Sequence, residues 1–248
     1  MIFKYSELEK FFKFLKENSK VTTLKDWDGA NEIILRHDVD FDIQAAYDLA
    51  MFEEKCGIRS SFFIMTTNLT YNPSTLENRK LLKRISDLGF EIGLHFDPLV
   101  YKHVDTNKLV EKVDEESFLL SKIIEKEIES VSLHNPSVHG QYTLFSNYNN
   151  AYDPKIFSSE TYISDSRMKF SIDPYEFVKR VKNHPIQILL HPLYYTIEGK
   201  TMPEIFYSFV KNFLLKIDGI YTENSTYAEL MKTDLFSYVT KIHGEKIS

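Results

Sequence analysis

Short apolar runs of strand length alternate along the chain with segments whose apolar residues recur at helical spacing. The predicted strands are 33–35, 60–65, 90–94, 131–133, 161–164 and 186–190. The predicted helices are 5–18, 43–55, 74–88, 106–126, 173–182 and, near the C-terminus, two helices within 203–236. Strands that alternate with helices in this way are typical of α/β proteins, in which successive strands run parallel. The alternation therefore predicts an α/β fold with a mostly parallel sheet.

The composition indicates one globular core and excludes several kinds of partner. The chain has 248 residues, of which 43% are hydrophobic, and we expect residues 1–248 to form a single domain. Acidic and basic residues are interspersed and give a net charge of −6, which argues against a nucleic-acid partner. Cys56 is the only cysteine, so zinc sites built from several thiolates are excluded.

The N-terminus lacks the features of an export signal. It alternates Phe and Leu with Lys and Glu, where a signal peptide would have a basic start, an apolar run and a small-residue cleavage site. No stretch approaches the roughly 20 apolar residues that span a bilayer, so we expect no integral membrane segment. These features favour a cytoplasmic location.

Ionisable residues follow five of the predicted strands, at the point where each strand ends. They are Asp38 and Asp40, His95 and Asp97, His134, Asp165 and Arg167, and His191. In parallel sheets and barrels the carboxyl ends of the strands lie on one face, where ligands bind. We therefore expect these side chains to converge on one site.

The spacing of Asp38 and Asp40 points to a metal ion. The two residues lie two positions apart, so in an extended chain their carboxylates point the same way. Two carboxylates this close require a cation between them or a proton-transfer role for one of them. A metal ion with an adjacent base satisfies both requirements. His95 is a candidate second ligand, because carboxylate oxygen and imidazole nitrogen are donors that zinc and similar divalent ions accept.

Two neighbouring residues are assigned to structure rather than to chemistry. Asp42 directly precedes the predicted helix 43–55, and we assign it as the N-cap of that helix. His37 lies on the opposite side of the strand from Asp38 and Asp40. We therefore expect His37 to pack in the interior rather than to bind a ligand.

Three motifs resemble those of a known family. RHDVD (36–40), EIGLHFD (91–97) and ILLHP (188–192) are similar to motifs of the polysaccharide deacetylases, carbohydrate esterase family four. The resemblance covers roughly residues 31–195 and implies a distorted (β/α)7-type barrel. It is closer to the RHDVD-bearing branch associated with surface-polysaccharide biosynthesis than to chitin or peptidoglycan deacetylases.

The resemblance also implies a role for each matching residue. Asp38 would be the general base, Asp40 and His95 metal ligands, and His191 the general acid. The segment YISDSR (162–167) is similar to the family segment whose acid orients this last histidine, and that acid here is Asp165. Its companion Arg167 would keep Asp38 ionised.

The sequence departs from the family pattern in two places. The family has a second metal-binding histidine four residues after the first, but position 99 is leucine. The candidates for the third ligand are His134, Asp97 and His103, of which we favour His134. The arginine that the family carries in its third motif is missing from SLHNPS (132–137). The candidates to replace it are Arg36 and Arg167.

These residues together predict a metal-dependent hydrolase. The expected reaction is the removal of an N-acetyl group from an amino sugar or a polysaccharide precursor by metal-activated water. The expected cofactor is one divalent ion, Zn²⁺ first, with Co²⁺ or Ni²⁺ as alternatives. The expected partner is a carbohydrate, for instance a nucleotide-linked or lipid-linked sugar. The tyrosines proposed to stack on it are Tyr142, Tyr148, Tyr194 and Tyr195.

Two other functions remain open from the sequence. The missing histidine at position 99 motivates a catalytically silent barrel that still binds carbohydrate. Because a fold does not determine a function, the same residues also suit a metal hydrolase of another C–N or ester bond.

Overall fold

The structure divides the chain into two compact units. The computed structural model describes residues 3–102, 105–140 and 142–245. The first unit is Met1–Gly199 and the second is Lys200–Ser248. The first unit contains strands and helices in alternation, which confirms the predicted α/β fold. That residues 200–248 belong to the same domain stays a prediction.

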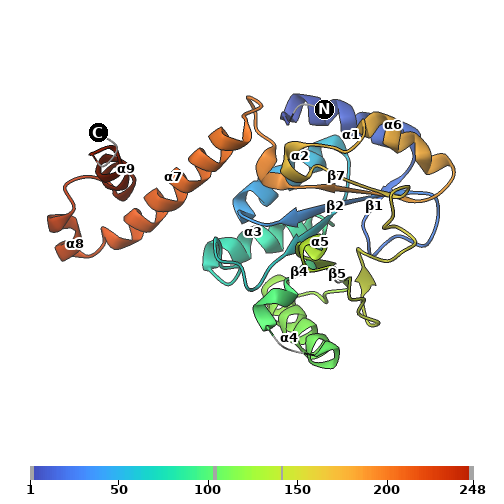
Figure 1. The fold of residues 1–248 in the computed structure, drawn as a ribbon, viewed down its shortest axis with the longest axis horizontal. Helices are drawn as coiled ribbons and strands as arrows, with labels where there is room; N and C mark the ends of the chain where they lie inside the picture. Colours follow the sequence, from blue (N-terminus) through green and yellow to red (C-terminus); the bar gives the residue numbers. More distant parts are fainter. Residues whose placement is uncertain (1–2, 103–104, 141, 246–248) are drawn as a thin grey trace. The chain divides into compact units, whose positions relative to one another are not determined.

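One curled sheet forms the centre of the first unit (Figure 1). Its strands are β1 (Val21–Thr22), β2 (Ile33–Val39), β3 (Ser61–Ile64), β4 (Glu91–Phe96), β5 (Ser130–Leu133), β6 (Asn149–Asn150), β7 (Tyr162–Ser164) and β8 (Ile186–Leu190). They follow the order β6-β5-β4-β3-β2-β8-β7, and β1 pairs with the start of β2. Every pairing within the described residues is parallel. This arrangement matches the predicted distorted (β/α)7-type barrel.

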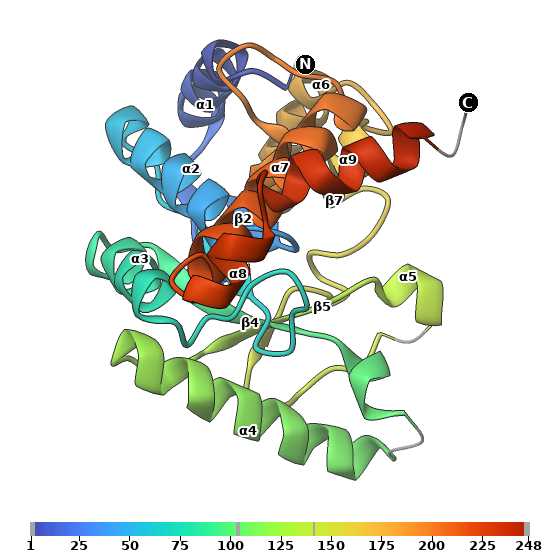
Figure 2. The ribbon, with the colours of Figure 1, turned by 90° about the vertical axis from the view of Figure 1, so that its left-hand side faces the viewer.

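Helices α1 to α4 lie side by side along the sheet (Figure 2). The helices of this unit are α1 (Tyr5–Asn18), α2 (Ile43–Cys56), α3 (Leu76–Asp87), α4 (Thr106–Ile124), α5 (Pro136–His139) and α6 (Pro174–Val178). Four short 3-10 turns accompany them: η1 (Pro98–Tyr101), η2 (Ser166–Met168), η3 (Lys179–Lys182) and η4 (Pro192–Tyr194). The N-terminal helix has the predicted bounds.

Strand β2 is longer than the sequence predicted. The sequence predicted a strand of residues 33–35 only. The strand continues to residue 39, because residues 36–39 pair with β3. All seven of its residues are buried, as is typical of a central parallel strand covered on both faces. Asp38 therefore lies within the strand, and Asp40 follows its end.

The start of α2 and the packing of His37 agree with the sequence. Asp42 is the N-cap of α2, and its side chain accepts the backbone N–H of Gln44. His37 is buried, and its Nε2 lies 2.8 Å from Oε1 of the equally buried Glu53. Its Nδ1 lies 3.3 Å from the carbonyl oxygen of Leu190. His37 therefore joins α2 to β8 on the side of β2 away from the site.

Between residues 200 and 245, the part of the second unit that the structure describes, there are three helices. They are α7 (Met202–Tyr221), α8 (Ser225–Leu230) and α9 (Leu235–Glu245), where the sequence predicted two helices within 203–236. Thr201 and Glu204 form a capping box at the start of α7. The ring of Phe236 in α9 packs edge-on against Tyr207 in α7, with their centroids 5.6 Å apart. None of the described helices is long and apolar enough to span a bilayer.

Candidate metal centre and active site

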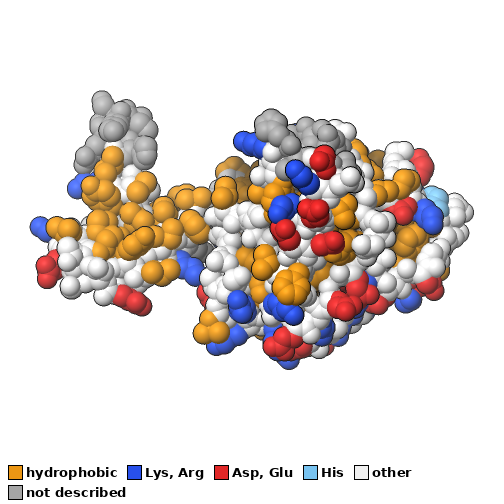
Figure 3. Space-filling view, turned by 90° about the horizontal axis from the view of Figure 1, so that it is seen from below, with side chains coloured by type: hydrophobic (Ala, Val, Ile, Leu, Met, Phe, Trp, Pro, Cys, Tyr) orange, Lys and Arg blue, Asp and Glu red, His pale blue; other side chains and the backbone are white. Residues whose placement is uncertain are grey.

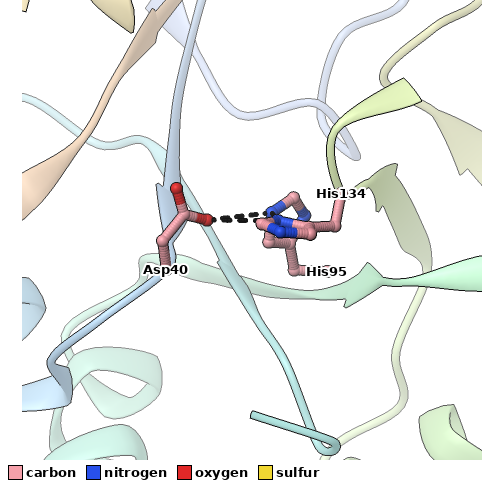
Figure 4. A group of neighbouring side chains, drawn as sticks. All are labelled: Asp40, His95 and His134. Carbon is pink, nitrogen blue, oxygen red and sulfur yellow. Dashed lines mark hydrogen bonds and ion pairs between the residues drawn. The ribbon is translucent and has the colours of Figure 1, made fainter. Parts of the chain in front are cut away.

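Three side chains from the same edge of the sheet face one another (Figure 4). Asp40 follows β2, His95 lies in β4, and His134 follows β5. Nε2 of His95 lies 3.2 Å from Oδ1 of Asp40 and 3.1 Å from Nδ1 of His134. Nδ1 of His134 lies 3.5 Å from the same oxygen of Asp40. One donor atom from each residue thus falls within 4.8 Å of the others, which is a grouping that can hold a metal ion.

The hydrogen bonds of the two histidines orient their donor atoms. Nδ1 of His95 lies 3.1 Å from the carbonyl oxygen of Ser132, so this nitrogen carries the proton and Nε2 presents its lone pair to the group. Nε2 of His134 lies 2.8 Å from the side-chain amide of Asn135. The contacting atom is the amide nitrogen Nδ2, which donates to Nε2 and so fixes the orientation of the His134 ring. One carboxylate and two imidazoles are a donor set that fits zinc or a similar divalent ion.

The two histidines also act on the charge of Asp40. Burial alone would raise the pKa of Asp40, but hydrogen bonds from His134 and His95, together with the charges of His95 and His191, outweigh it and hold the pKa well below its ordinary range. The carboxylate is therefore ionised, as a metal ligand must be.

The structure brings His134, the favoured third-ligand candidate, to the group. His95 is directly opposite Ser132 in the pairing of β4 with β5, so the residue that follows β5 arrives beside the histidine of β4. Asp97 caps the turn η1, where its side chain accepts the N–H of Leu99. His103, the remaining candidate, lies outside the described residues. Leu99 is half exposed in the same turn.

Asp38 is buried beside this group. Its Oδ2 lies 4.0 Å from Nε2 of His95. The hydroxyl of Ser132 donates to Asp38, with an Oγ to Oδ1 distance of 3.2 Å, and itself accepts a hydrogen bond of 2.7 Å from Nη1 of Arg36. Nη2 of Arg36 lies 3.7 Å from Oδ2 of Asp38. The buried carboxylate of Asp38 thus has a buried cation and a hydroxyl group to compensate its charge.

Arg36, and not Arg167, is the arginine beside Asp38. The prediction gave this role to Arg167, but that residue is exposed in the turn η2, where its φ of 59° is left-handed. Arg36 is fully buried, because it lies two residues before Asp38 on the same face of β2. Its guanidinium also packs over the ring of Tyr152, 4.9 Å from the centroid. The spacing of Arg36 and Asp38 is the sequence signal that identifies this pair.

His191 and Asp165 form a second pair at the opposite side of Asp40. Nδ1 of His191 lies 2.5 Å from Oδ1 of the fully buried Asp165, whose other oxygen accepts the hydroxyl of Tyr195. Nε2 of His191 points to Asp40, 3.7 Å from its Oδ2. Burial would lower the pKa of His191, but the charge of Asp165 and its hydrogen bond prevail and raise the pKa to about 9. The ring is therefore protonated at neutral pH and can donate a proton from Nε2.

These groups open into a cleft of about 210 Å³. Its ionisable lining is Asp40, His95, His134 and His191, and its aromatic lining is Tyr142, Tyr152, Phe157 and Tyr162. The rings contact one another in sequence, with Phe157 4.6 Å from Tyr152 and 4.9 Å from Tyr162 between centroids. We call these four residues the aromatic wall. The cleft has side chains that can bind a metal ion on one side and aromatic faces on the other. This lining suits a polar ring that carries a hydrolysable substituent.

Of the four tyrosines expected to stack on a sugar, Tyr142 lines the cleft. Tyr148 instead donates its hydroxyl to Asp114. Tyr194 and Tyr195 are buried beside His191 and Asp165 and do not present a ring to the cleft. The other three members of the aromatic wall were not predicted: Tyr152 and Phe157 come from a stretch without periodic signal, and Tyr162 was placed in a strand without a role.

Comparisons with known proteins find structural neighbours only. No family model and no curated protein matches the sequence. The fold is similar to the Xyl-CE4 domain of a multidomain xylanase from the hindgut metagenome of Trinervitermes trinervoides, at 16% identity over 73% of this chain and 82% of that chain, with a TM-score of 0.44. It is similar to peptidoglycan deacetylase PdaC from Bacillus subtilis, at 17% identity over 74% and 84%, with a TM-score of 0.42.

A third neighbour is a pseudoenzyme. The wild-type protein BA3943 from Bacillus anthracis, a CE4 family pseudoenzyme, is 12% identical over 74% of this chain and 62% of that chain, with a TM-score of 0.41. This chain thus spans less than two thirds of the length of BA3943. The roles proposed below rest on the geometry of the site in this chain.

Proposed function

We propose that the protein is a metal-dependent deacetylase that hydrolyses the N-acetyl group of an amino sugar or a polysaccharide precursor. The observation that carries this proposal is the convergence of three functions on one cleft. A metal-binding group, a buried carboxylate base and a protonated histidine all lie around Asp40. Amide hydrolysis needs these three: an activated water, a base to receive its proton and an acid to protonate the leaving amine.

Asp40, His95 and His134 would hold the metal ion. When bound there, a divalent ion supplies a water of lowered pKa and polarises the amide carbonyl. Zn²⁺ is the ion that this donor set suits best, and Co²⁺ and Ni²⁺ accept the same donors. Asp38 takes the proton of the attacking water, because it lies next to the group and the buried Arg36 compensates its charge.

His191 protonates the departing amine. Its Nε2 faces the metal group, and Asp165 fixes the ring by binding both Nδ1 and the backbone N–H of the same residue. This arrangement holds the proton on Nε2 until the C–N bond breaks. The amine is otherwise too basic to leave, so the proton transfer completes the reaction to acetate and a free amino sugar.

The aromatic wall would receive the sugar ring. Pyranose rings present apolar C–H faces that pack on aromatic side chains, and Tyr142 is the half-exposed member of the wall. A cleft of about 210 Å³ suits a single sugar unit held near the metal group. As an example of such a substrate, we propose a sugar that is linked to a nucleotide or to a lipid.

The test is acetate release from N-acetylated amino sugars by the zinc-loaded protein. We expect release by the wild type and a loss of about 10² to 10⁴-fold in Asp38→Asn, because the base is removed and the shape is kept. Asp97→Asn is the matched control and should retain activity, since Asp97 caps a turn.

Acetate release, measured together with metal uptake and sugar binding, separates the alternative functions. Release from O-acetyl esters without release from N-acetyl sugars would assign the protein to ester hydrolysis instead. Metal uptake and sugar binding without any acetate release would leave a silent carbohydrate-binding barrel. Wild-type protein that takes up no divalent ion would contradict the metal mechanism.

A further inference from the structure

A buried histidine and a buried glutamate of the first unit have no part in the chemistry proposed above. On the face of the molecule shown in Figure 3, acidic and basic side chains are interspersed, as is usual for a surface in contact with water. His37 and Glu53, in contrast, are fully buried and lie against each other. Burying polar groups costs free energy, so such a pair in the interior requires an explanation.

The surroundings of His37 fix the direction of its ring. Its Nε2 lies 2.8 Å from Oε1 of Glu53, and the other oxygen of Glu53 accepts the hydroxyl of Ser60 at 2.5 Å. The ring of Phe62 packs against the imidazole, with 4.5 Å between the centroids. Nδ1 of His37 lies 3.3 Å from the carbonyl oxygen of Leu190. Because a carbonyl oxygen can only accept, Nδ1 carries a hydrogen and donates it to Leu190.

The carbonyl group of Leu190 belongs to the peptide unit that leads into His191. The nitrogen of the same peptide unit is the backbone N–H of His191, which donates to Oδ2 of Asp165 at 3.0 Å. Two fully buried side chains thus hold one peptide unit, His37 at its oxygen and Asp165 at its nitrogen. Since a peptide unit is planar and includes the following Cα, these two bonds orient the Cα from which the His191 imidazole extends.

The register of the sheet brings His37 to this peptide unit. His37 is directly opposite Leu190 in the pairing of β2 with β8. Side chains alternate along β2, so Asp38 faces the site while His37 faces the other way, toward α2. Strand β2 therefore supplies the proposed base on one face, and on the other face a contact to the strand of the proposed acid.

We propose that His37 is a positioning residue for His191, because its hydrogen bond to the carbonyl oxygen of Leu190 orients the backbone that carries the His191 imidazole. Glu53 in turn holds the ring of His37. This inference rests on the proposed function, in which His191 protonates the leaving amine. A reacting group that is displaced by about 1 Å can lose about 10²-fold in rate, so the contact matters for catalysis as well as for folding.

Two substitutions separate the two contacts of His37. The side-chain amide of asparagine lies at about the position of Nδ1 of histidine, whereas that of glutamine reaches about the position of Nε2. His37→Asn therefore keeps a donor for Leu190 and loses the contact with Glu53, and His37→Gln does the reverse. We expect kcat for acetate release to fall about 10²-fold in His37→Gln with KM little changed, and by less than about tenfold in His37→Asn. His184→Gln, before the start of β8, is the matched control and should retain the wild-type kcat.

Hydrogen exchange of the His191 amide gives a measurement that does not depend on activity. This amide is protected while Asp165 accepts its hydrogen. In NMR spectra we expect slow exchange in the wild type and in His37→Asn, and exchange about tenfold faster in His37→Gln. Far-UV circular dichroism checks that each variant is folded.

A double variant covers the case in which His37→Gln does not fold. His37→Leu combined with Glu53→Met replaces the buried pair by apolar side chains, a change that commonly leaves a protein folded. The double variant also lacks the donor for Leu190, so we expect the same fall in kcat and the same faster exchange of the His191 amide.

The outcomes for the inference and for the proposed function are distinct. If the wild type releases acetate and the folded variants that lack the donor have the same kcat, the inference is overturned and the proposed function stands. Equal losses of kcat in His37→Gln and His37→Asn also overturn the inference, because a purely structural role predicts them. A wild type that releases no acetate contradicts the proposed function. In that case unchanged exchange of the His191 amide in the variants overturns the inference as well.

Discussion

Asp165 holds His191 at two points, through the ring and through the backbone. Its Oδ1 lies 2.5 Å from Nδ1 of His191, and its Oδ2 lies 3.0 Å from the backbone nitrogen of the same residue. The imidazole can therefore neither turn about its χ angles nor shift along β8 without breaking a bond to a buried carboxylate. The ring stays aimed at Asp40 while its proton is delivered.

This pair makes the pH dependence of the reaction predictable. Asp165 raises the pKa of His191 to about 9, so the acid form persists to that pH and the rate falls only above it. Asp165→Asn removes the charge and lets the pKa fall, so the alkaline limb of the kcat/KM profile should move to lower pH. Tyr195→Phe, which removes one hydrogen bond to Asp165 and keeps its charge, should leave the limb nearer its wild-type position. An unchanged limb in Asp165→Asn would exclude His191 as the acid.

The metal content of the purified protein tests directly whether Asp40, His95 and His134 hold an ion. We expect about one divalent ion per chain in the wild type and a large loss in Asp40→Ala, His95→Ala and His134→Ala, because each removes one of three protein donors. Inductively coupled plasma mass spectrometry of the purified proteins measures it. Asp97→Ala is the control that retains the ion. Retention of the ion in His134→Ala, with loss in the other two, would show that the third donor is another residue.

The buried Arg36 should be important for stability. Arg36→Met leaves Asp38 as a buried charge without its cation, which costs about 3 to 5 kcal/mol in the free energy of unfolding. Urea denaturation at neutral pH measures this loss. Arg167→Met should change the value by less than about 0.5 kcal/mol, because the side chain is exposed. Equal effects of the two substitutions would contradict the assignment of Arg36 as the partner of Asp38.

Glu91 gives a prediction for stability against pH. Burial raises the pKa of this carboxyl above its usual value of 4.5, although hydrogen bonds including that from Ser61 oppose the shift. The folded state therefore holds the proton more tightly than the unfolded chain, and stability falls as the pH rises above 4.5 toward the folded pKa. Glu91→Gln should become more stable relative to wild type over that range, in urea titrations at several pH values. The exposed Glu127→Gln should show no such trend.

The aromatic wall predicts a binding effect. Tyr142→Ala should raise KM about fivefold with little change in kcat, because one ring face contributes about 1 kcal/mol to sugar binding. Tyr142→Phe should restore KM, since the ring face remains. Tyr148→Ala, whose hydroxyl contacts Asp114 instead, should behave as the wild type. A fall in kcat in place of a rise in KM would place Tyr142 in the chemistry.

The fold could be predicted because its signals are local. Alternating strand and helix patterns gave the parallel sheet, and helical spacing with polar flanks gave α1 with its observed ends. The two-residue strands β1 and β6 were missed, because a pair of residues has no periodicity to detect. The third C-terminal helix was missed as well, since α9 extends beyond residue 236.

The site residues that follow the strands were predictable for the same reason, whereas the position of Arg36 and most of the aromatic wall were not. Strand ends place Asp40, His95 and His134 on one face, and the structure brings them together. The sequence left Arg36 and Arg167 as alternatives because β2 was expected to stop at residue 35, and the alternation of Arg36 with Asp38 along the strand was therefore not used. Three of the four members of the aromatic wall lie in an irregular segment, whose path is determined by tertiary packing and not by local pattern.

The origin of the three donors on β2, β4 and β5 has a consequence for folding. Two histidines only a few residues apart in the sequence can bind one ion together even when the rest of the chain is unfolded. Here the donors are separated by 55 and 39 residues along the sequence and meet only when three strands have paired. The unfolded chain would therefore offer no chelate, and binding of an ion to the three residues would add to the stability of the native sheet. An ion held there would link the ends of β2, β4 and β5. Its removal would destabilise the same edge of the sheet that carries the proposed catalytic residues.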